Sequence, residues 1–255
     1  MSTDLRAAER QNHLESYISL AKSRGGEVRQ FGSITAISTG VPHPEFNRVF
    51  VFEPPSHDDF TAAIEWVEFH DVPFWLTTTE ATSQLIEDFA ADHGFLKIDR
   101  TTPGMVLESL DEIPPRDSDV DIIEVTDSTH LEDFVTVFSA VFDVPAEYLR
   151  PDPSNSNSTE DDTRTALVGY LDDRPVATGN LFRSDAVAGV FAIAVVEAVR
   201  GRGIGETMTW EVLQAGREAG CQIGALQSTE MAIPLYEKLG FETVETYHYF
   251  ESNTE

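Results

Sequence analysis

Three glycines stand at alternate positions, Gly201, Gly203 and Gly205, with Arg200 and Arg202 interleaved. They follow the apolar run VFAIAVV and directly precede a segment with helical periodicity. A helix N-terminus exposes unpaired N–H groups and a partial positive charge, and glycines let the backbone approach a ligand closely. This spacing indicates either a cradle for a phosphate-bearing ligand or a structural turn flanked by surface arginines.

Three phosphate-binding patterns compete for this stretch. A P-loop requires a Gly-Lys pair, which the chain does not contain. The dinucleotide pattern G-x-G-x-x-G requires glycine at the position of Glu206. The third pattern, Arg/Gln-x-x-Gly-x-Gly/Ala, fits Arg200 to Gly205, and both the preceding strand and the following helix that it requires are indicated.

The Gly-rich stretch is followed by a second segment, PLYEKLGF (Pro234 to Phe241). Together the two segments resemble the GNAT superfamily of N-acetyltransferases, in which the second reads L-Y-x-x-x-G-F. The order of elements from about Asp121 to Phe250 also fits. The resemblance implies an α/β (α+β) fold with a mixed, mostly antiparallel central sheet flanked by helices, preceded by a smaller GNAT-like α/β domain.

The resemblance also implies acetyl-CoA as the co-substrate, held between two splayed strands, and no metal. Backbone groups of the strand would contact the pantetheine and the acetyl carbonyl, and the Gly-rich turn would cradle the pyrophosphate. A threonine stands where many members have an asparagine that contacts the pantetheine. The implied cofactor-binding residues are Ile193, Ala194, Val195, Arg200, Gly201, Arg202, Gly203, Ile204, Gly205, Glu206 and Thr229.

Tyr236 matches the general acid of the family. A phenol with an ordinary pKa near 10 is protonated at neutral pH and can donate its proton to a departing thiolate. The alternative is a core aromatic on a buried helix face. The general base stays open, because Glu197 is expected to face solvent and the helical region of His130, Glu147 and Tyr148 offers only weak candidates.

Apolar periodicity predicts the elements that would position these residues. Helices are expected over roughly 4–23, 56–70, 81–94, 128–143, 204–219 and 229–240. Strands are expected over 33–39, 48–53, 73–78, 102–108, 121–127, 221–226 and 241–251, with several more between 165 and 196. Asp172-Asp173 and Arg183-Ser184-Asp185 are the expected turns within that last run.

Two halves are indicated by a weak internal repeat, in which Trp75 to Phe95 parallels Ala225 to Phe241. Duplication and chance similarity both explain it. We expect a degenerate GNAT-like domain without a cofactor motif at 1–115 and an acetyltransferase domain at 116–255. The acidic stretch 107–121 contains a Pro pair and is typical of a linker, and the polar stretch 150–163 indicates a lid or a disordered loop.

The composition excludes several function classes. The formal charge of −28, from 45 acidic and 17 basic residues, argues against nucleic-acid binding, which depends on neutralising phosphates. There is no apolar run long enough to span a membrane and no secretory signal, so we expect a cytoplasmic protein without membrane partners. Cys221 is the single cysteine, and the histidines show no metal-ligand spacing. The acidic, lysine-poor composition resembles that of proteins from salt-loving organisms.

The sequence thus predicts an acetyl-CoA-dependent N-acetyltransferase that transfers the acetyl group directly to a primary amine of a small molecule or peptide. An amino acid, a polyamine, an antibiotic and a protein N-terminus all stay open as acceptors. The alternative is a non-catalytic acyl-CoA-binding or scaffold protein that retains the fold. The sequence carries no signal for an oligomeric state.

Overall fold

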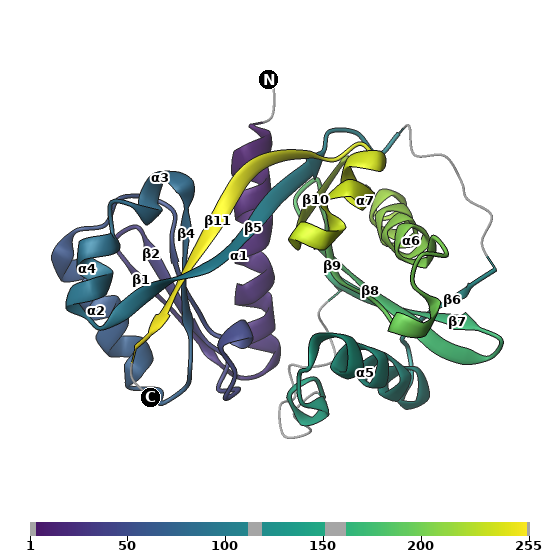
Figure 1. Ribbon diagram of the computed structural model, residues 1–255, viewed down its shortest axis with the longest axis horizontal. Coiled ribbons are helices and arrows are strands. Elements are labelled where there is room, and N and C mark those ends of the chain that lie inside the picture. The colour runs from purple at the N-terminus through teal and green to yellow at the C-terminus, as the bar shows by residue number, and fades with distance from the viewer. Residues whose placement is uncertain (1–3, 112–118, 151–161, 254–255) are drawn as a thin grey trace. The chain divides into compact units, whose positions relative to one another are not determined.

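The computed structural model describes residues 4–111, 119–150 and 162–253 (Figure 1). These residues form two compact units that interleave along the chain. Unit 1 comprises the described parts of 1–13, 105–150 and 162–242, and unit 2 comprises 14–104 and 243–253. Residues 112–118 of the expected linker and 151–161 of the polar loop lie outside the described residues, and so does the expected domain boundary at 115/116.

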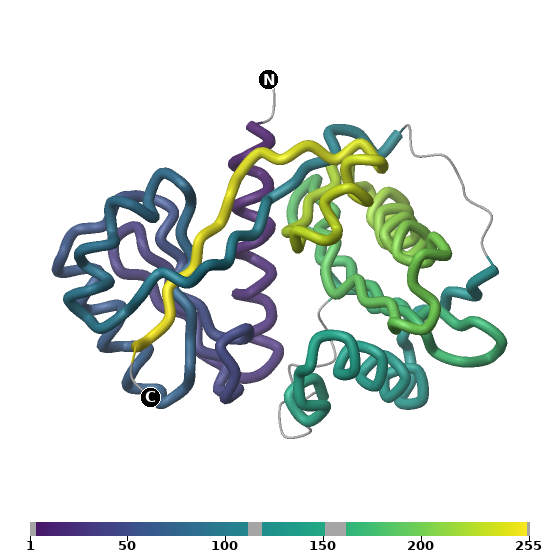
Figure 2. The backbone as a smooth tube through the Cα atoms, viewed as in Figure 1, coloured from purple at the N-terminus to yellow at the C-terminus, as the bar shows by residue number. Residues whose placement is uncertain are grey.

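Unit 2 is built around a small sheet in the order β1-β2-β3-β4-β11-β5. Strands β3 and β4 are parallel, whereas the pairs β1–β2, β2–β3 and β4–β11 are antiparallel. The tube in Figure 2 shows β5 and β11 running next to each other. In chain order the elements are α1 (Leu5–Ser23, in this unit from Leu14), β1 (Glu27–Phe31), β2 (Ile34–Ser38), η1 (Pro44–Phe46), β3 (Arg48–Val51), α2 (His57–Glu68), β4 (Trp75–Thr79), α3 (Glu80–Ser83), α4 (Glu87–Asp92), β5 (Phe95–Leu107, to Gly104) and β11 (Glu242–Ser252, from Thr243).

Helix α2 forms because its apolar residues recur at helical spacing and its N-terminus is capped. The Ser56 side chain accepts a hydrogen bond from the Asp59 N–H and so caps the helix. Phe60, Ala63 and Ile64 lie on the buried face and pack in a core cluster with strand residues. On its other face the unit 2 sheet carries a smaller cluster with α1.

Unit 1 contains the order β10-β9-β8-β7-β6, with the end of β5 next to β10. Only β9 and β10 are parallel among the pairs from β6 to β10 in the described part of the chain. Figure 1 shows α5 and α6 on opposite sides of β7–β9. In chain order the elements are β6 (Asp121–Glu124), α5 (Ser128–Phe142), η2 (Ala146–Tyr148), β7 (Arg164–Leu171), β8 (Arg174–Ser184), β9 (Val187–Val195), η4 (Glu197–Val199), α6 (Ile204–Glu218), β10 (Ile223–Gln227), η5 (Glu230–Ala232) and α7 (Ile233–Lys238).

The fold class predicted from the sequence is confirmed, with local differences. Strand β1 was not predicted, because its side chains are nearly all exposed and show no apolar alternation. The helix expected over 81–94 is two short helices, and the one over 229–240 begins as a 3-10 turn. Strand β8 runs through Ser184, so the turn falls at Asp185 (φ 47°) and Ala186. The other hairpin turn is confirmed, with Asp172 and Asp173 both at positive φ.

Candidate active site

The parallel pair β9–β10 opens partway along β9. The last paired residues are Val190 and Leu226, but β9 continues through Val195 while β10 ends one residue later at Gln227. The segment Phe191–Val195 therefore has no β10 partner. The segment includes Ile193, Ala194 and Val195, and its backbone groups on that side have no strand partner, although the Val195 carbonyl accepts a hydrogen bond from Arg200.

A bulge in β9 lies at this opening. The register with β8 shifts between Thr178 and Asn180, which face Ala194 and Phe191, so β9 holds one extra residue. Ala192 takes φ 55°, a conformation costly for a residue with a Cβ, and its carbonyl accepts a hydrogen bond from Thr178 Oγ1 at 2.8 Å. The bulge therefore changes the direction of β9 at the point where its pairing with β10 stops.

The Gly-rich turn connects β9 to α6 with two residues in the left-handed region. Gly201 has φ 77° and Gly203 has φ 80°, and a Cβ on either would meet nothing within 4 Å. Backbone conformation, rather than crowding, therefore requires glycine at both positions. Gly203 is the N-cap of α6 and supplies no side-chain cap, and the first helical bond runs from Thr207 N–H to the Gly203 carbonyl.

Because of this arrangement, the N–H groups of the first turn of α6 lack helical acceptors. With the helix dipole they form an anion-binding terminus, at which charge-assisted hydrogen bonds contribute about 1.5–3 kcal/mol each and the dipole about 0.3–1 kcal/mol. The amides, rather than the dipole, would dominate binding of a phosphate group.

Three elements converge at Gly205. A Cβ there would lie 3.6 Å from Leu235 Cδ2 on α7 and 3.7 Å from Val195 Cγ2 on β9. The start of α6 therefore packs against both the open end of β9 and the helix that carries Tyr236. The two sequence segments singled out for chemistry, more than 25 residues apart, are brought to one place.

Tyr236 is buried in the unit 1 core, with 7% of its surface exposed. Burial raises the pKa of its phenol to about 12, although a hydrogen bond with the Thr209 hydroxyl opposes the rise. Thr209 Oγ1 in turn donates to the Gly205 carbonyl at 2.9 Å. The phenol is therefore protonated at neutral pH, which suits a proton donor and excludes a base, and Thr209 links it to the Gly-rich turn.

The charged side chains near the Gly-rich turn differ in their exposure and in their hydrogen-bond partners. Arg200 and Arg202 are exposed, and Arg200 Nε donates to the Val195 carbonyl at 2.9 Å. The buried Glu206 carboxylate accepts from Lys238 Nζ at 2.7 Å, which offsets a negative charge in the first turn. The Lys238 side chain itself stays 63% exposed.

The remaining residues considered from the sequence lie apart from this cluster. Thr229 is exposed at the N-cap of η5, and its carbonyl accepts from the Ser228 hydroxyl at 2.8 Å. Glu197 is exposed, as expected. His130 Nδ1 lies 3.0 Å from the Asp127 carboxylate at the start of α5. Sequence reasoning missed Thr209 and the Ala192 bulge. Thr209 stands one helical turn after Gly205, which could have indicated it, whereas nothing in the sequence marks Ala192.

In unit 2, β3, α2 and β4 form a strand–helix–strand arrangement like that of β9, α6 and β10, but the two strands do not separate. Strands β3 and β4 stay paired to the end of β3, where Val51 faces Thr78. The Val51 carbonyl accepts a hydrogen bond from Thr82 Oγ1 at 2.7 Å. At the start of α2, Ser56 caps the helix and Asp59 adds a carboxylate. This helix start therefore lacks the open strand end and the uncapped amides found in unit 1.

No group of three or more His, Cys, Asp or Glu side chains in the part of the chain that the structure describes could hold a metal ion. No helix within the same residues is long and apolar enough to cross a membrane.

Comparisons with known proteins match part of this chain to one family of acetyltransferases. Residues 131–241 match the family model "Acetyltransferase (GNAT) family". Glucosamine 6-phosphate N-acetyltransferase of Trypanosoma brucei brucei is 35% identical over 60 residues, or 24% of this chain and 41% of that protein. The match thus spans about two fifths of the length of that relative.

Solved structures extend the similarity to both units. A GCN5-related N-acetyltransferase from Kribbella flavida aligns with a TM-score of 0.71 and 18% identity over 96% of both chains. A tandem GNAT protein from the clavulanic acid biosynthesis pathway aligns with a TM-score of 0.56 and 16% identity, over 86% of this chain and 78% of its own. At these identities the similarity establishes the fold, and it covers the N-terminal half as well.

Proposed function

Because residues 131–241 form a domain of the GNAT acetyltransferase family, we propose that this protein transfers an acetyl group from acetyl-CoA directly to a primary amine. The observation that carries the proposal is the meeting of the uncapped α6 N-terminus, the open end of β9 and the Tyr236 helix at Gly205. We further propose 116–255 as the acetyltransferase domain and 1–115 as a GNAT-like domain without cofactor machinery.

The residues present fit acetyl-CoA as co-substrate. Ile193, Ala194 and Val195 offer backbone groups along the open edge of β9 to the pantetheine. The amides from Gly201 to Glu206 hold the pyrophosphate, and Arg200 and Arg202 add positive charge in an otherwise acidic chain. Thr229 contributes a polar group near the end of β10. Arg200 releases the Val195 carbonyl when the pantetheine takes that position.

In the reaction, the neutral amine attacks the thioester carbonyl, so that a C–N bond forms and the C–S bond breaks. Tyr236 donates its proton to the departing sulfur, and the amine nitrogen loses one proton to solvent or to a base that the chain supplies. Because burial raises the Tyr236 pKa, the phenolate formed is quickly reprotonated. Thr209 is a positioning residue, since it fixes the phenol relative to the turn.

The test is a thiol-release assay with acetyl-CoA and a panel of amines that includes amino acids, polyamines, aminoglycosides and peptide N-termini. High salt suits so acidic a chain, and at about 1 M the Debye length is near 3 Å, so the global charge no longer repels CoA. Release that depends on one amine class identifies the acceptor. Absence of binding of both acetyl-CoA and CoA by calorimetry would refute the proposal.

A non-catalytic acyl-CoA-binding protein is the rival function. It predicts CoA binding without amine-dependent thiol release, and no kinetic effect of Tyr236→Phe. The proposed enzyme predicts that Tyr236→Phe lowers kcat by about 100-fold or more, within the range for loss of a general acid, with little change in CoA affinity. The burial of Tyr236 in the core favours neither function by itself. The effect of Tyr236→Phe on kcat, compared with its effect on CoA affinity, therefore decides between them.

A further inference from the structure

A cavity of about 390 Å³ lies in unit 2, where it is lined by residues from three separate segments. The turn after α1 supplies Arg24 and Glu27, the end of β2 supplies Ser38 and Gly40, and His70 follows α2. A volume of this size accommodates a small metabolite. The cavity lies in unit 2, whereas the Gly-rich turn belongs to unit 1.

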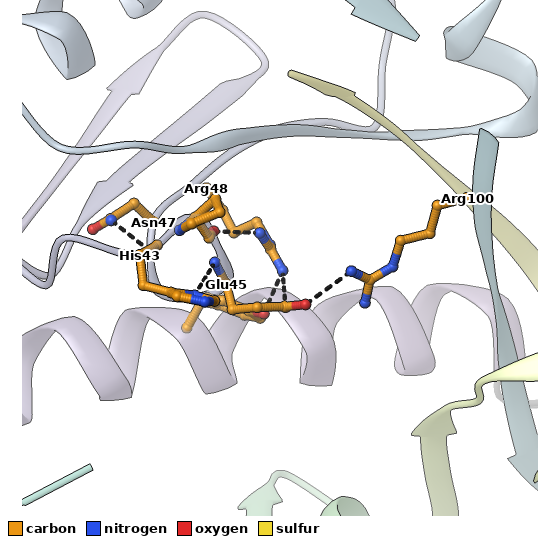
Figure 3. A network of polar contacts seen from close by, with 7 residues as sticks. His43, Glu45, Asn47, Arg48 and Arg100 are labelled. Atoms are coloured by element: carbon orange, nitrogen blue, oxygen red, sulfur yellow. Dashed lines mark hydrogen bonds and ion pairs between the residues drawn. The ribbon is translucent and has the colours of Figure 1, made fainter. Parts of the chain in front are cut away.

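The cavity wall from residue 39 to 43 is held rigidly by Asn47. Its side-chain carbonyl accepts from the Thr39 N–H at 2.9 Å and from Thr39 Oγ1 at 3.1 Å. Its amide donates to the carbonyls of Val41, His43 and Pro73 at 2.8, 3.1 and 2.9 Å. Figure 3 shows Asn47 beside His43 in this network. A buried side chain that makes five hydrogen bonds preorganises the wall, which reduces the entropy lost when a ligand binds.

The opposite wall is fixed by close backbone packing. A Cβ on Gly26 would lie 2.3 Å from the Ser38 carbonyl oxygen, so only glycine lets the turn after α1 approach β2. Glu27 pairs with Ser38 across the β1–β2 hairpin, which places both side chains on the same face of the sheet. The two walls therefore keep a fixed separation.

Arg24 brings an uncompensated positive charge to this cavity. Its guanidinium lies over the Phe46 ring at 5.3 Å, and among the described residues it has no carboxylate partner. The guanidinium is partly buried, and this desolvation lowers the pKa of Arg24 from its usual value. In a chain with 45 acidic residues, a desolvated arginine without a carboxylate is a ready receptor for an anionic group.

Other polar residues that line the cavity have unused hydrogen-bonding capacity. Ser38 is 1% exposed, and its Oγ has no hydrogen-bond partner within the described part of the chain. His70 Nδ1 lies 2.8 Å from the Trp66 carbonyl, so it carries the proton, and in the neutral ring Nε2 is an acceptor. Nε2 stands 3.6 Å from a Glu27 carboxylate oxygen. The cavity therefore offers a donor for an anion and a pair of acceptors for a cation.

We propose that this cavity binds a small zwitterion of the α-amino-acid class, with its carboxylate on Arg24 and its ammonium group on Glu27 and His70. A simple anion would be attracted by Arg24 but repelled by the Glu27 carboxylate. A simple amine would gain Glu27 but would face the Arg24 guanidinium. A molecule that carries both charges pairs with Arg24 on one side of the cavity and with Glu27 on the other.

The experiment titrates the full chain with the standard L-amino acids and follows thermal unfolding and the fluorescence of Trp66, whose ring lies 4.4 Å from His70. For L-alanine, propionate lacks the ammonium group and ethylamine lacks the carboxylate, so these two probes are run beside it. We expect saturable binding of one or more amino acids and at least about tenfold weaker binding of the corresponding acid and amine, because each lacks a charge-assisted contact.

Three variants locate the binding. Arg24→Gln is expected to weaken amino-acid binding by about tenfold or more, whereas Arg29→Gln removes the same charge from an exposed β1 residue outside the cavity and should have no effect. Glu27→Gln changes a side chain that is 70% exposed, so this variant is expected to fold normally. Unlike the wild type, it should bind propionate more tightly than the amino acid.

Each contrary outcome overturns the proposal. If no amino acid shifts either signal at about 10 mM, far above the range of a specific metabolite site, the cavity is not such a site. Binding that is unchanged in both Arg24→Gln and Glu27→Gln would place the amino acid elsewhere, for example as acceptor in the unit that carries the Gly-rich turn. Equal affinity for propionate and L-alanine would indicate a general anion site instead.

Discussion

Substitution of Gly203 by alanine tests the Gly-rich turn most selectively. Gly203 holds φ 80°, and a Cβ there meets no atom within 4 Å, so the substitution strains the backbone without creating a clash. The left-handed conformation costs an L-residue about 1–2 kcal/mol. At about 2–4 °C per kcal/mol for a chain of this size, Tm should fall by roughly 2–8 °C.

Ligand binding should suffer more than stability. Relaxation of the strained residue turns the first amides of α6 away from the pyrophosphate position, and loss of one charge-assisted hydrogen bond of about 1.5–3 kcal/mol weakens CoA binding roughly 10- to 150-fold. Calorimetric titration with CoA at high salt measures the affinity, and a thermal melt of the same sample measures the stability.

Gly205→Ala is the matched control, two residues further on. Its Cβ would make ordinary contacts of 3.6 and 3.7 Å inside a helix, where replacement of glycine by alanine stabilises by about 0.4–1 kcal/mol. We therefore expect an unchanged or raised Tm and wild-type CoA affinity. If Gly203→Ala binds CoA as tightly as the wild type, the assignment of the turn as the pyrophosphate site is refuted. Equal loss of affinity in both variants would refute backbone strain at Gly203 as the cause of the loss.

Three further substitutions test the burial of the Tyr236 phenol in unit 1 and two side-chain contacts in unit 2. Between pH 10 and 12 the unfolded chain loses the Tyr236 proton before the folded protein does, so stability falls with rising pH, and Tyr236→Phe should reduce that slope by up to about 1.4 kcal/mol per pH unit in denaturant titrations. Thr82→Val should cost about 1–3 kcal/mol, because the buried Val51 carbonyl loses its partner, as measured by urea unfolding. Glu45→Gln should cost about 3 kcal/mol in the same assay, because Arg48, whose side chain is 3% exposed, loses the carboxylate that it shares with Arg100 (Figure 3).

Matched controls separate these effects from general damage. Thr61→Val removes a hydroxyl that has no hydrogen-bond partner among the described residues, so it should cost little, and an equal loss would contradict the reasoning on Thr82. Glu53→Gln changes the same charge as Glu45→Gln at an exposed position and should be near neutral. A Tyr236→Phe protein with the wild-type alkaline slope would contradict the buried phenol.

The chemistry-bearing part of the fold could be predicted from the sequence because it follows local rules. The apolar strand, the glycines and the amphipathic helix after Gly203 specify β9, the turn and α6 by spacing and backbone conformation. The capping serine at Ser56 fixed the start of α2 in the same way. Tyr236 was found through its segment rather than through any property of the residue.

Features that depend on tertiary contacts could not be predicted. The opening of β9 at Val190 depends on where β10 ends, and the bulge at Ala192 breaks the local preference for glycine at positive φ. Strand β1 forms by pairing with β2 and has almost no buried face of its own. The interleaving of the two units arises because β5 and β11 each run through both, which no local pattern records.

Amide hydrogen–deuterium exchange of the full chain with and without acetyl-CoA tests the central claim most directly. The account predicts that acetyl-CoA protects the amides of 191–195 and 201–206, where β9 is unpaired and α6 begins, and leaves 51–59 in unit 2 unchanged. Protection at 51–59, or exchange at 201–206 that acetyl-CoA does not slow under saturating conditions, would contradict it.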